Sequence, residues 1–306
     1  MKVFITGATG FVGQEVVCQA HQNGHSLRIQ ARDSQTPSVR ELALKTKAEI
    51  HPGDVLDSRS LEGALEGAEA VIHLVGIISE VGNCTFENIH IQGTRNMVAA
   101  SQRSGAKRFL HMSALGTRLG AVSRYHQSKW AAEEIVRQSG LEYTIFRPSL
   151  IYGPRDHFVN LFAKLSKFSP VLPIMAKGEA RFQPVSVATV AEAFIRALNE
   201  PRAIRETFDL CGLETLTLPQ ILDTILGVTE RKRWQLRIPL AIARCQAALL
   251  ELVYCRILRK APPLNRDQLI MLQEDNVGEG GKAEELLGLG QTRFRDGIAG
   301  YLKRKT

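Results

Sequence analysis

Tyr125 and Lys129 have the types and the spacing needed for proton transfer, since they end the run Tyr-His-Gln-Ser-Lys. On a helix this spacing puts both side chains on one face, one turn apart. A lysine ammonium there can lower the pKa of the phenol and bind a ribose hydroxyl, so that the phenol exchanges a proton with a carbonyl as a hydride moves. Ser113 could polarise the same carbonyl, and its alternative role is to cap the end of a strand.

A glycine-rich turn near the start of the chain could hold the partner of that chemistry. The apolar run Lys2–Thr6 leads into Gly-Ala-Thr-Gly-Phe-Val-Gly, residues 7–13, and a helical pattern begins at about Phe11. Glycines at this spacing allow a tight turn and a close approach of backbone to phosphate, while the free N–H groups of the helix face the negative charge. The sequence therefore predicts a dinucleotide site here, and the flanking strand and helix disfavour a turn without a ligand.

Strand and helix patterns alternate through the first half of the chain, which is typical of a parallel sheet covered on both faces. After the first strand, the expected strands are Leu27–Ala31, Ala48–His51, Ala70–Val75, Arg108–Met112 and Tyr143–Arg147. The expected helices cover about 11–23, Leu61–Leu65, Glu87–Ser104 and Tyr125–Ser139. The fold class is thus α/β, with a Rossmann-type doubly wound parallel sheet.

The second half is expected to form a smaller C-terminal α/β lobe. Beyond residue 153 the alternation weakens and prolines increase, so we predict a dinucleotide-binding domain over 1–153 and a substrate lobe over 154–306. A segment at about 182–211 is expected to return to the sheet. The stretch Pro239–Leu258 is too polar to span a membrane and predicts an amphipathic helix. We favour packing of this helix on the protein's own core, and docking on a membrane surface is the alternative.

Composition places the chain among globular proteins with anionic partners. The 306 residues are 44% hydrophobic and carry a formal net charge of +8. Two tight basic clusters, at 231–233 and 303–305, are expected to be solvated surface. Five cysteines, without C-x-x-C spacing, fit a reducing compartment and argue against a disulfide framework and a zinc site. With no signal peptide before the first strand, we expect a cytoplasmic protein and no bound metal.

A specific resemblance emerges from motifs that follow one another in order along about half of the chain. The matching segments are Thr6–Gly13, Gly53-Asp54-Val55, Val71–Gly76, Gly93–Asn96, the pair Tyr125 and Lys129, and Arg147–Pro154. On these the chain resembles extended or atypical members of the short-chain dehydrogenase/reductase superfamily. Looser motifs, His73–Ile78, Gln183–Val187, Pro263–Gln268 and Asp275-Asn276-Val277, resemble the branch of the nucleotide-binding accessory subunit of respiratory complex I and its bacterial relatives.

This resemblance implies roles for individual residues. Asp54 and Val55 would meet the adenine, Lys129 would hold the nicotinamide ribose, and the turn after Pro148 would back the nicotinamide ring. Leu74, Val75 and Gly76 would line the path between them. Tyr125, Lys129 and Ser113 would be catalytic. The full set implied for coenzyme binding is Gly7, Thr9, Gly10, Phe11, Val12, Gly13, Arg32, Asp54, Val55, Leu74, Val75, Gly76, Lys129 and Pro148.

The end of the second strand bears on the choice of coenzyme. In relatives that prefer NAD, an acid there binds the ribose hydroxyls, whereas this chain has Ala31 followed by Arg32. A guanidinium suits a 2′-phosphate, which an acid would repel. Asp33 lies one position further along the chain, and as an acid it favours NAD. We predict NADP(H) as the coenzyme in preference to NAD(H).

Two departures from the family pattern bear on turnover. Eleven residues separate Ser113 from Tyr125, about half the usual gap in extended members, so the loop on the substrate side is short. The family's Asn in Asn-x-x-Gly-Thr, which supports the lysine, is His90 here. Neither change touches the predicted coenzyme site.

Several functions remain open from the sequence. The first is an NADPH-dependent oxidoreductase acting on a small carbonyl, hydroxyl or quinone-like substrate. The second is a non-catalytic NADPH-binding protein within an assembly, and the third is a sugar-nucleotide epimerase or dehydratase. A regulator that binds nucleic acid through residues 231–233 is the least favoured. Peripheral association with the inner face of a membrane or with a respiratory complex, the oligomeric state and the substrate itself are also left open.

Overall fold

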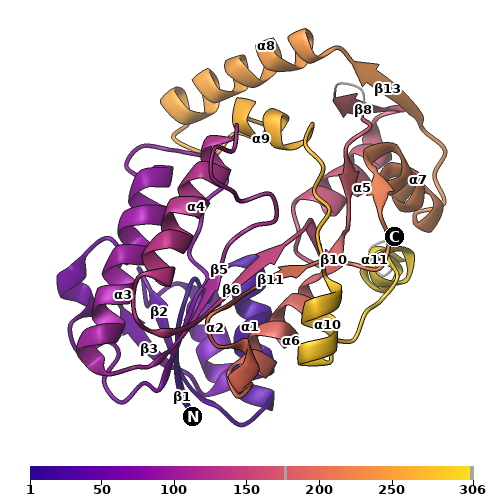
Figure 1. The fold of residues 1–306 in the computed structure, drawn as a ribbon. Coiled ribbons are helices and arrows are strands. Elements are labelled where there is room, and N and C mark those ends of the chain that lie inside the picture. The colour runs from indigo at the N-terminus through magenta and orange to yellow at the C-terminus, as the bar shows by residue number, and fades with distance from the viewer. Residues whose placement is uncertain (176–177, 304–306) are drawn as a thin grey trace.

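The structure is a computed structural model that describes residues 1–175 and 178–303. Its centre is a seven-stranded parallel sheet, shown in Figure 1. In spatial order the strands are β11 (Glu206–Leu210), β6 (Glu142–Pro148), β5 (Arg108–Met112), β4 (Ala70–His73), β1 (Lys2–Thr6), β2 (Ser26–Ala31) and β3 (Glu49–Pro52). The predicted α/β class and Rossmann-type sheet are confirmed.

The direction of winding reverses at β1, which fixes where a ligand can bind. Ile5 of β1 pairs with Ile29 of β2 on one side and with Ile72 of β4 on the other. The connections from these neighbouring strands run to opposite faces of the sheet, and such a switch point opens a crevice at the carboxyl ends of the strands. Residues that follow β1, β2 and β4 therefore face the same crevice.

Helices cover both faces of the sheet because each presents an apolar stripe to the strands. One face carries α1 (Phe11–Gln22), α2 (Pro37–Thr46), α6 (Val187–Ala197) and α10 (Gly281–Leu287). The other carries α3 (Gly93–Ser104) and α4 (Arg124–Arg137). The π-helical turn Glu87–Gln92 leads into α3. Each face has its own buried core, so the sheet holds α1 and α4 rigidly on opposite sides of the crevice.

A second group of elements forms the lobe beside the sheet. It contains α5 (Phe158–Phe168), β8 (Val171–Met175), α7 (Leu218–Val228), β13 (Trp234–Ile238) and α11 (Phe294–Leu302). Short strands add the pairs β7 (Ile151–Tyr152) with β10 (Val185–Ser186) and β9 (Arg181–Phe182) with β12 (Leu216–Thr217). The lobe has a separate apolar core around Phe294, Ile221 and Ile225. The division at residue 153 stays a prediction, while β11 lies in the main sheet beside β6.

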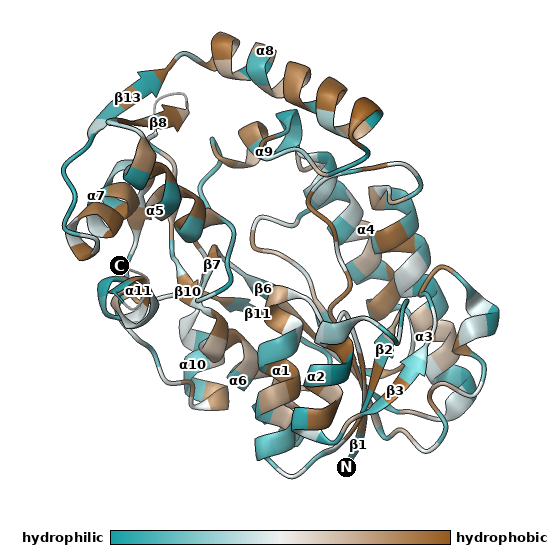
Figure 2. Cartoon of the chain, turned by 180° about the vertical axis from the view of Figure 1, so that it is seen from behind, coloured by the Kyte–Doolittle hydropathy of each residue, from teal (hydrophilic) through white to brown (hydrophobic). Residues whose placement is uncertain are grey.

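A helical arch joins the lobe to the α4 side of the sheet, as Figure 1 shows. It consists of α8 (Leu240–Glu251), a π-helical turn at Leu252–Ile257, and α9 (Arg266–Met271) beneath them. The expected helix over 239–258 is present, and it packs on the protein through a small core cluster of Ala243, Ala247 and Leu269. Many of its other side chains are exposed, and α8 lies at the outer edge of the molecule in Figure 2.

Local chemistry explains the remaining differences from the predicted elements. The helix expected at Leu61–Leu65 is a 3₁₀ turn at Ser58–Leu61 followed by turns, because Gly63 and Gly67 adopt positive φ. Helix α2 was not predicted. Two members of the 231–233 cluster are not free surface: Arg231 donates to the carbonyl oxygen of Ala163 and Arg233 to that of Ser166, at the carboxyl end of α5. In the other basic cluster, residues 304 and 305 lie outside the described residues.

Candidate functional site

The glycine turn between β1 and α1 leaves room for backbone alone. Gly7 has φ +71°, and a Cβ added to it would lie 2.9 Å from the carbonyl carbon of Leu74. A Cβ on Gly13 would lie 2.1 Å from the carbonyl oxygen of Gly7. Gly10 is the N-cap of α1, and no side chain caps this helix end. The free N–H groups of α1 are thus open to an anion, and the cradle fits the diphosphate of a dinucleotide.

The other predicted coenzyme residues lie at the same edge of the sheet. Because all seven strands are parallel, segments that follow them emerge together at their carboxyl ends. Asp54 and Val55 follow β3, and the Val55 carbonyl accepts a hydrogen bond of 2.8 Å from Asn96 on α3. Further predicted residues at or after the strand ends are Thr9, Phe11 and Val12 after β1, Arg32 after β2, Leu74, Val75 and Gly76 after β4, and Pro148 at the end of β6.

Arg32 and Asp33 have different environments after β2. Arg32 is exposed, and it makes no hydrogen bond or ion pair within residues 1–175 and 178–303. The Asp33 carboxylate instead accepts hydrogen bonds from the Gln35 backbone N–H at 2.8 Å and from the Thr36 hydroxyl at 3.1 Å. These contacts fix the turn that leads into α2, so the acid is engaged locally and the guanidinium is free to meet a ligand.

Helix α4 brings Tyr125 and Lys129 to the crevice. The Lys129 ammonium is buried and donates a 3.0 Å hydrogen bond to the carbonyl oxygen of Met112, at the end of β5. A Cβ on Gly76 would lie 3.1 Å from the same ammonium, so Lys129 also lies against the segment after β4. The Tyr125 ring is enclosed by the rings of Phe86, His90 and His126, with centroid distances of 5.4 to 5.9 Å.

His90 is built into the support of α4. Its Nε2 accepts a 3.0 Å hydrogen bond from the Ile77 backbone N–H, which leaves the proton on Nδ1. That Nδ1–H donates to the Ser128 hydroxyl at 2.8 Å, and Ser128 in turn donates to the Tyr125 carbonyl at 2.7 Å. This chain joins the segment after β4 to the turn of α4 that carries both predicted catalytic side chains.

Burial sets the proton affinity of both residues. It raises the pKa of Tyr125 to about 12. It lowers the pKa of Lys129 to about 8, against an opposing influence of Glu133. The expected lowering of the tyrosine pKa by the lysine is wrong here, because burial of the phenol raises its pKa. Tyr125 is consequently a protonated phenol at neutral pH, which can donate a proton and does not readily accept one.

Ser113 occupies the end of β5 but is not joined to Tyr125. Its backbone N–H donates to the Phe146 carbonyl at 2.7 Å, and its buried hydroxyl lies 3.4 Å from the hydroxyl of Thr117. No hydrogen bond links Ser113 to Tyr125 within the part of the chain that the structure describes. These contacts match the alternative role of a strand-end hydroxyl that stabilises the short loop before α4.

Two further histidines lie beneath the site, inside the sheet. His73 on β4 bonds Thr6 at 2.7 Å and Thr94 at 3.3 Å, and its ring stacks on His111 of β5 at a centroid distance of 5.5 Å. Neither ring nitrogen of His111 has a hydrogen-bond partner among the described residues. Burial, reinforced by Lys129, lowers the pKa of His73 to about 3 and of His90 to about 2. All three histidines are therefore neutral at physiological pH.

The late segment around α9 fixes the amino end of α4. The Asp267 carboxylate accepts hydrogen bonds from the backbone N–H groups of Arg124 at 2.9 Å and Tyr125 at 3.0 Å, and from the Ser123 hydroxyl at 2.9 Å. Asn265 donates to the Ile78 carbonyl at 3.0 Å. A carboxylate at this end of a helix satisfies free donors and opposes the positive end of the helix dipole.

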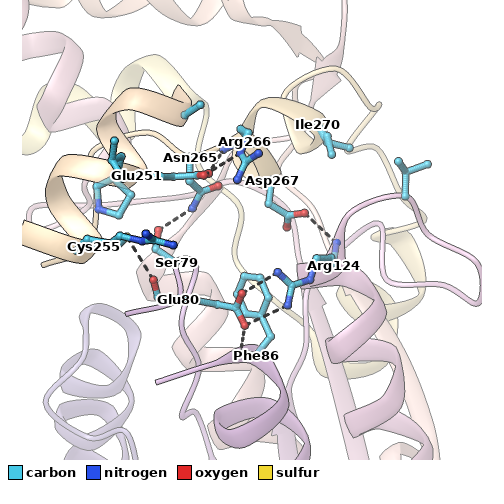
Figure 3. Close-up of a pocket in the computed structure, with 15 residues that line it drawn as sticks. Ser79, Glu80, Phe86, Arg124, Glu251, Cys255, Asn265, Arg266, Asp267 and Ile270 are labelled. Atoms are coloured by element: carbon cyan, nitrogen blue, oxygen red, sulfur yellow. Dashed lines mark hydrogen bonds and ion pairs between the residues drawn. The ribbon is translucent and has the colours of Figure 1, made fainter. Parts of the chain in front are cut away.

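A cavity of about 710 Å³ lies between the arch and the amino end of α4, and Figure 3 shows the side chains around it. Arg124 and Glu80 form an ion pair of 2.9 Å on one wall. Phe86, the ring partner of Tyr125, lies beside them. The arch contributes Leu252, Cys255 and Arg256, and the Cys255 thiol lies 3.5 Å from the carbonyl oxygen of Glu80. The cavity has a size that suits a small molecule, and Phe86 and Arg124 connect its wall to Tyr125, which does not itself line it.

Sequence reasoning missed the roles of Asp267, His73 and His111. The run Asn265 to Gln268 carries the signature of a capping box, and both reciprocal hydrogen bonds of that box are present in α9. That signal could have located the start of α9, but it contains nothing that names α4 as its partner. The two sheet histidines sit in apolar strand patterns and show no distinguishing spacing.

Comparisons with known proteins agree with this geometry. A sequence profile described as NAD(P)H-binding matches residues 7–201. NADH dehydrogenase (ubiquinone) 1 alpha subcomplex subunit 9 of Arabidopsis thaliana is 30% identical over 280 residues, which cover 89% of this chain and 68% of that protein. Ceramide reductase of Caulobacter vibrioides is 36% identical over 200 residues, covering 65% of this chain and 61% of that protein.

Solved structures show the same architecture. UDP-glucose 4-epimerase of Thermotoga maritima, solved with UDP-glucose, superposes with a TM-score of 0.77 at 21% identity and covers 100% of this chain and 99% of that one. At this identity the likeness concerns the fold alone. Within the described residues, no helix has the length and apolarity to cross a membrane. The glycine cradle, the sheet order and the matched profile together show that the chain belongs to the NAD(P)H-binding extended short-chain dehydrogenase/reductases, with the fold of the epimerases and dehydratases.

Proposed function

We propose that the protein is an NADPH-dependent reductase that acts on a carbonyl or quinone-like substrate. Two observations carry this proposal: three rings enclose the Tyr125 phenol, and a 710 Å³ cavity is lined by Phe86, one of those rings, and by Arg124, which precedes Tyr125 in the chain. A phenol with a pKa of about 12 holds its proton until a developing oxyanion takes it. Burial thereby favours reduction, in which Tyr125 gives up a proton, over alcohol oxidation, in which it would have to take one.

The reaction divides between the coenzyme and the chain. When bound, the coenzyme supplies the hydride to the electrophilic carbon of the substrate. The Tyr125 hydroxyl delivers a proton to the substrate oxygen, which yields an alcohol from a carbonyl. Lys129 lies one turn below and, as an ammonium, stabilises the phenolate that remains. The resulting phenolate recovers its proton from solvent.

The contacts after β2 support NADPH as the coenzyme. Arg32 is exposed and has no hydrogen bond or ion pair to any residue that the structure describes, so its guanidinium is available for a 2′-phosphate. Asp33 is the residue that favours NAD, but its carboxylate already accepts two hydrogen bonds within its own turn. The Asp33 carboxylate therefore repels a 2′-phosphate less than a carboxylate pointing at the ribose would.

Stopped-flow mixing tests the reductase. NADPH-loaded protein is mixed with short quinones, aldehydes and ketones while the absorbance of the reduced nicotinamide is followed. We expect oxidation with at least one class, and a loss of about 100-fold or more in the Tyr125→Phe variant, as expected for removal of a general acid. Tyr143→Phe, on β6 and away from the cavity, is the matched control and should retain the rate. Unchanged turnover in Tyr125→Phe would rule out the assigned proton donor.

A second candidate is a non-catalytic NADPH-binding subunit of an assembly. It is favoured by Ser113, whose hydroxyl lies 3.4 Å from that of Thr117 and makes no hydrogen bond to Tyr125 among the residues that the structure describes. The relatives named as subunits of NADH dehydrogenase in Arabidopsis thaliana and mouse agree with it, although the chain spans only 68% and 61% of their lengths. If none of the substrate classes oxidises NADPH and Tyr125→Phe leaves NADPH affinity unchanged, this second candidate replaces the reductase.

A further inference from the structure

The arch and the adjoining strand β13 expose an unusual share of the large apolar side chains of the protein. Fifteen such side chains are exposed among the described residues, and seven of them fall between residues 234 and 258. They are Trp234, Leu236, Ile242, Leu249, Leu252, Ile257 and Leu258. Single exposed apolar residues are ordinary on protein surfaces, whereas a group this dense marks a contact surface.

Helix α8 does not bury its large apolar side chains against its own protein. Ala243 and Ala247, one turn apart, face inward and are fully buried. Ile242 and Leu249 are separated by two turns and share an outward face, with side chains 59% and 61% exposed. Small residues toward the protein and large apolar ones toward solvent are expected of a helix whose apolar partner lies outside the chain.

The same segment has a high net positive charge. Between residues 230 and 260 there are eight lysines and arginines against two glutamates, a net charge of +6, compared with +8 for the whole protein. One of the glutamates, Glu251, is paired with Arg266 at 2.8 Å. The cations Arg237, Arg244, Arg256, Arg259 and Lys260 are all exposed. The partner of this surface must therefore be both apolar and anionic.

Trp234 marks one end of the surface. It is 81% exposed and lines a hollow of about 490 Å³ together with Arg231, Lys232 and Arg233, which Asp223 also borders. Tryptophan is enriched at the boundary between acyl chains and headgroups, and the exposed ammonium of Lys232 beside it would attract anionic headgroups.

We propose that this arch surface, residues 234–260, docks on the surface of an anionic lipid bilayer. Ile242 and Leu249 would enter the boundary between headgroups and acyl chains, and the flanking arginines would contact lipid phosphates. A second copy of the chain fits less well, because a two-fold interface would place the same surface, with a net charge of +4 from five cations and one glutamate, against itself. The arch shares Leu252 and Arg256 with the cavity, so a docked bilayer lies next to that cavity.

Vesicle sedimentation with the full chain tests the proposal. We expect the protein to pellet with vesicles of phosphatidylcholine and phosphatidylglycerol, to pellet weakly with phosphatidylcholine alone, and to be released by high salt. Replacing both Ile242 and Leu249 by glutamate should lower the affinity by about tenfold or more. Leu44→Glu on α2, where the native side chain is 82% exposed, is the matched control and should bind as the natural protein does.

A second variant tests the charge without adding acids to the helix. Replacing both Arg237 and Arg244 by glutamine, at two exposed positions, should weaken binding to phosphatidylglycerol and reduce its salt dependence. Far-ultraviolet circular dichroism and NADPH affinity verify the fold of each variant. No pelleting with anionic vesicles would overturn the proposal, as would full binding by both variants. Dissociation of a dimer by Leu249→Glu in light scattering, without vesicle binding, would assign the surface to a second copy instead.

The docking experiment is independent of the reductase. Vesicle binding is measured without substrate, so a failure of NADPH oxidation leaves it intact. Conversely, a protein that fails to bind vesicles can still reduce a soluble substrate.

Discussion

The carboxylate of Asp267 holds the backbone of Tyr125, 142 residues earlier in the sequence, through a 3.0 Å hydrogen bond to its N–H. The same carboxylate bonds the preceding N–H of Arg124 at 2.9 Å, while Ser123 caps His126 at 3.2 Å. Three of the four free donors at the start of α4 are thus satisfied. The position of the predicted proton donor therefore depends on a segment near the end of the chain.

Removing the Asp267 carboxylate should both destabilise the protein and displace Tyr125. We expect Asp267→Ala to lower the free energy of unfolding by about 1–2 kcal/mol, since it loses a helix cap and a favourable charge at the positive end of α4. Asp267→Asn keeps one acceptor and should cost less. Urea denaturation measures the effect, with Asp57→Ala, an exposed cap on a single 3₁₀ turn, as the control. Equal stability of Asp267→Ala and the natural protein would contradict this interpretation.

The glycine at position 13 should tolerate no side chain. An alanine Cβ would lie 2.1 Å from the Gly7 carbonyl oxygen, and because this neighbour is backbone, α1 must move. We expect Gly13→Ala to lower stability by about 1–3 kcal/mol and to abolish NADPH binding in calorimetry.

The matched control for Gly13→Ala is Gly227→Ala in α7. A Cβ at this position meets nothing within 4 Å, and the helical backbone favours alanine. The substitution should therefore raise stability by about 0.5–1 kcal/mol. Similar effects of the two substitutions would show that the cradle is not as tight as described.

Local chemistry determines how much of this could be predicted from the sequence. The glycine turn and β1 were predictable because spacing, strand and helix signals lie within about a dozen residues of one another. Helix α2 was missed because its apolar positions, Val39, Leu42 and Ala43, are few and lie among charged residues. The helix predicted at Leu61–Leu65 rests on a short apolar run without a helical period, and Gly63 within this run and Gly67 after it adopt positive φ instead.

The sequence predicts which residues belong to the candidate site better than it predicts their proton affinities and contacts. Tyr125 and Lys129 could be found from their spacing, but the pKa of Tyr125 depends on its enclosure by Phe86 and His90, which come from other elements. The contact of Asp267 with α4 depends on how the arch folds back, which no local pattern encodes. Tertiary packing therefore supplied what sequence spacing could not.

Coenzyme preference should depend on Arg32. We expect Arg32→Ala to weaken NADPH binding by about 10- to 100-fold, the loss typical of a hydrogen bond to a charged group, and to leave NADH affinity unchanged. Isothermal calorimetry with both coenzymes gives the comparison. Arg40→Ala, at an exposed position of α2, controls for the general loss of positive charge. Equal affinity of the natural protein for the two coenzymes would refute the preference for NADPH.

The three buried histidines predict a specific loss of stability in acid. Burial lowers the pKa of His73 to about 3 and of His90 to about 2, and it lowers that of His111 strongly as well. In the unfolded chain each titrates near 6.5. Below pH 6.5 the unfolded state therefore binds protons that the folded state does not, and stability falls as the pH decreases toward the folded pKa values. Each histidine contributes about 1.4 kcal/mol per pH unit in this window.

His111 separates this effect from the titration of other groups. Its ring nitrogens are buried without partners in the part of the chain that the structure describes, so His111→Leu removes two unsatisfied polar atoms and should leave stability at pH 7.5 equal or higher. The same substitution should reduce the slope of unfolding free energy against pH between 5 and 6 by about 1.4 kcal/mol per pH unit, because one proton fewer is taken up on unfolding. Urea denaturation at pH 7.5 measures the stability, and a series of urea denaturations between pH 5 and 6 measures the slope. An unchanged slope would mean that His111 is protonated in the folded protein, and that its environment beside His73 and Lys129 is more polar than the structure describes.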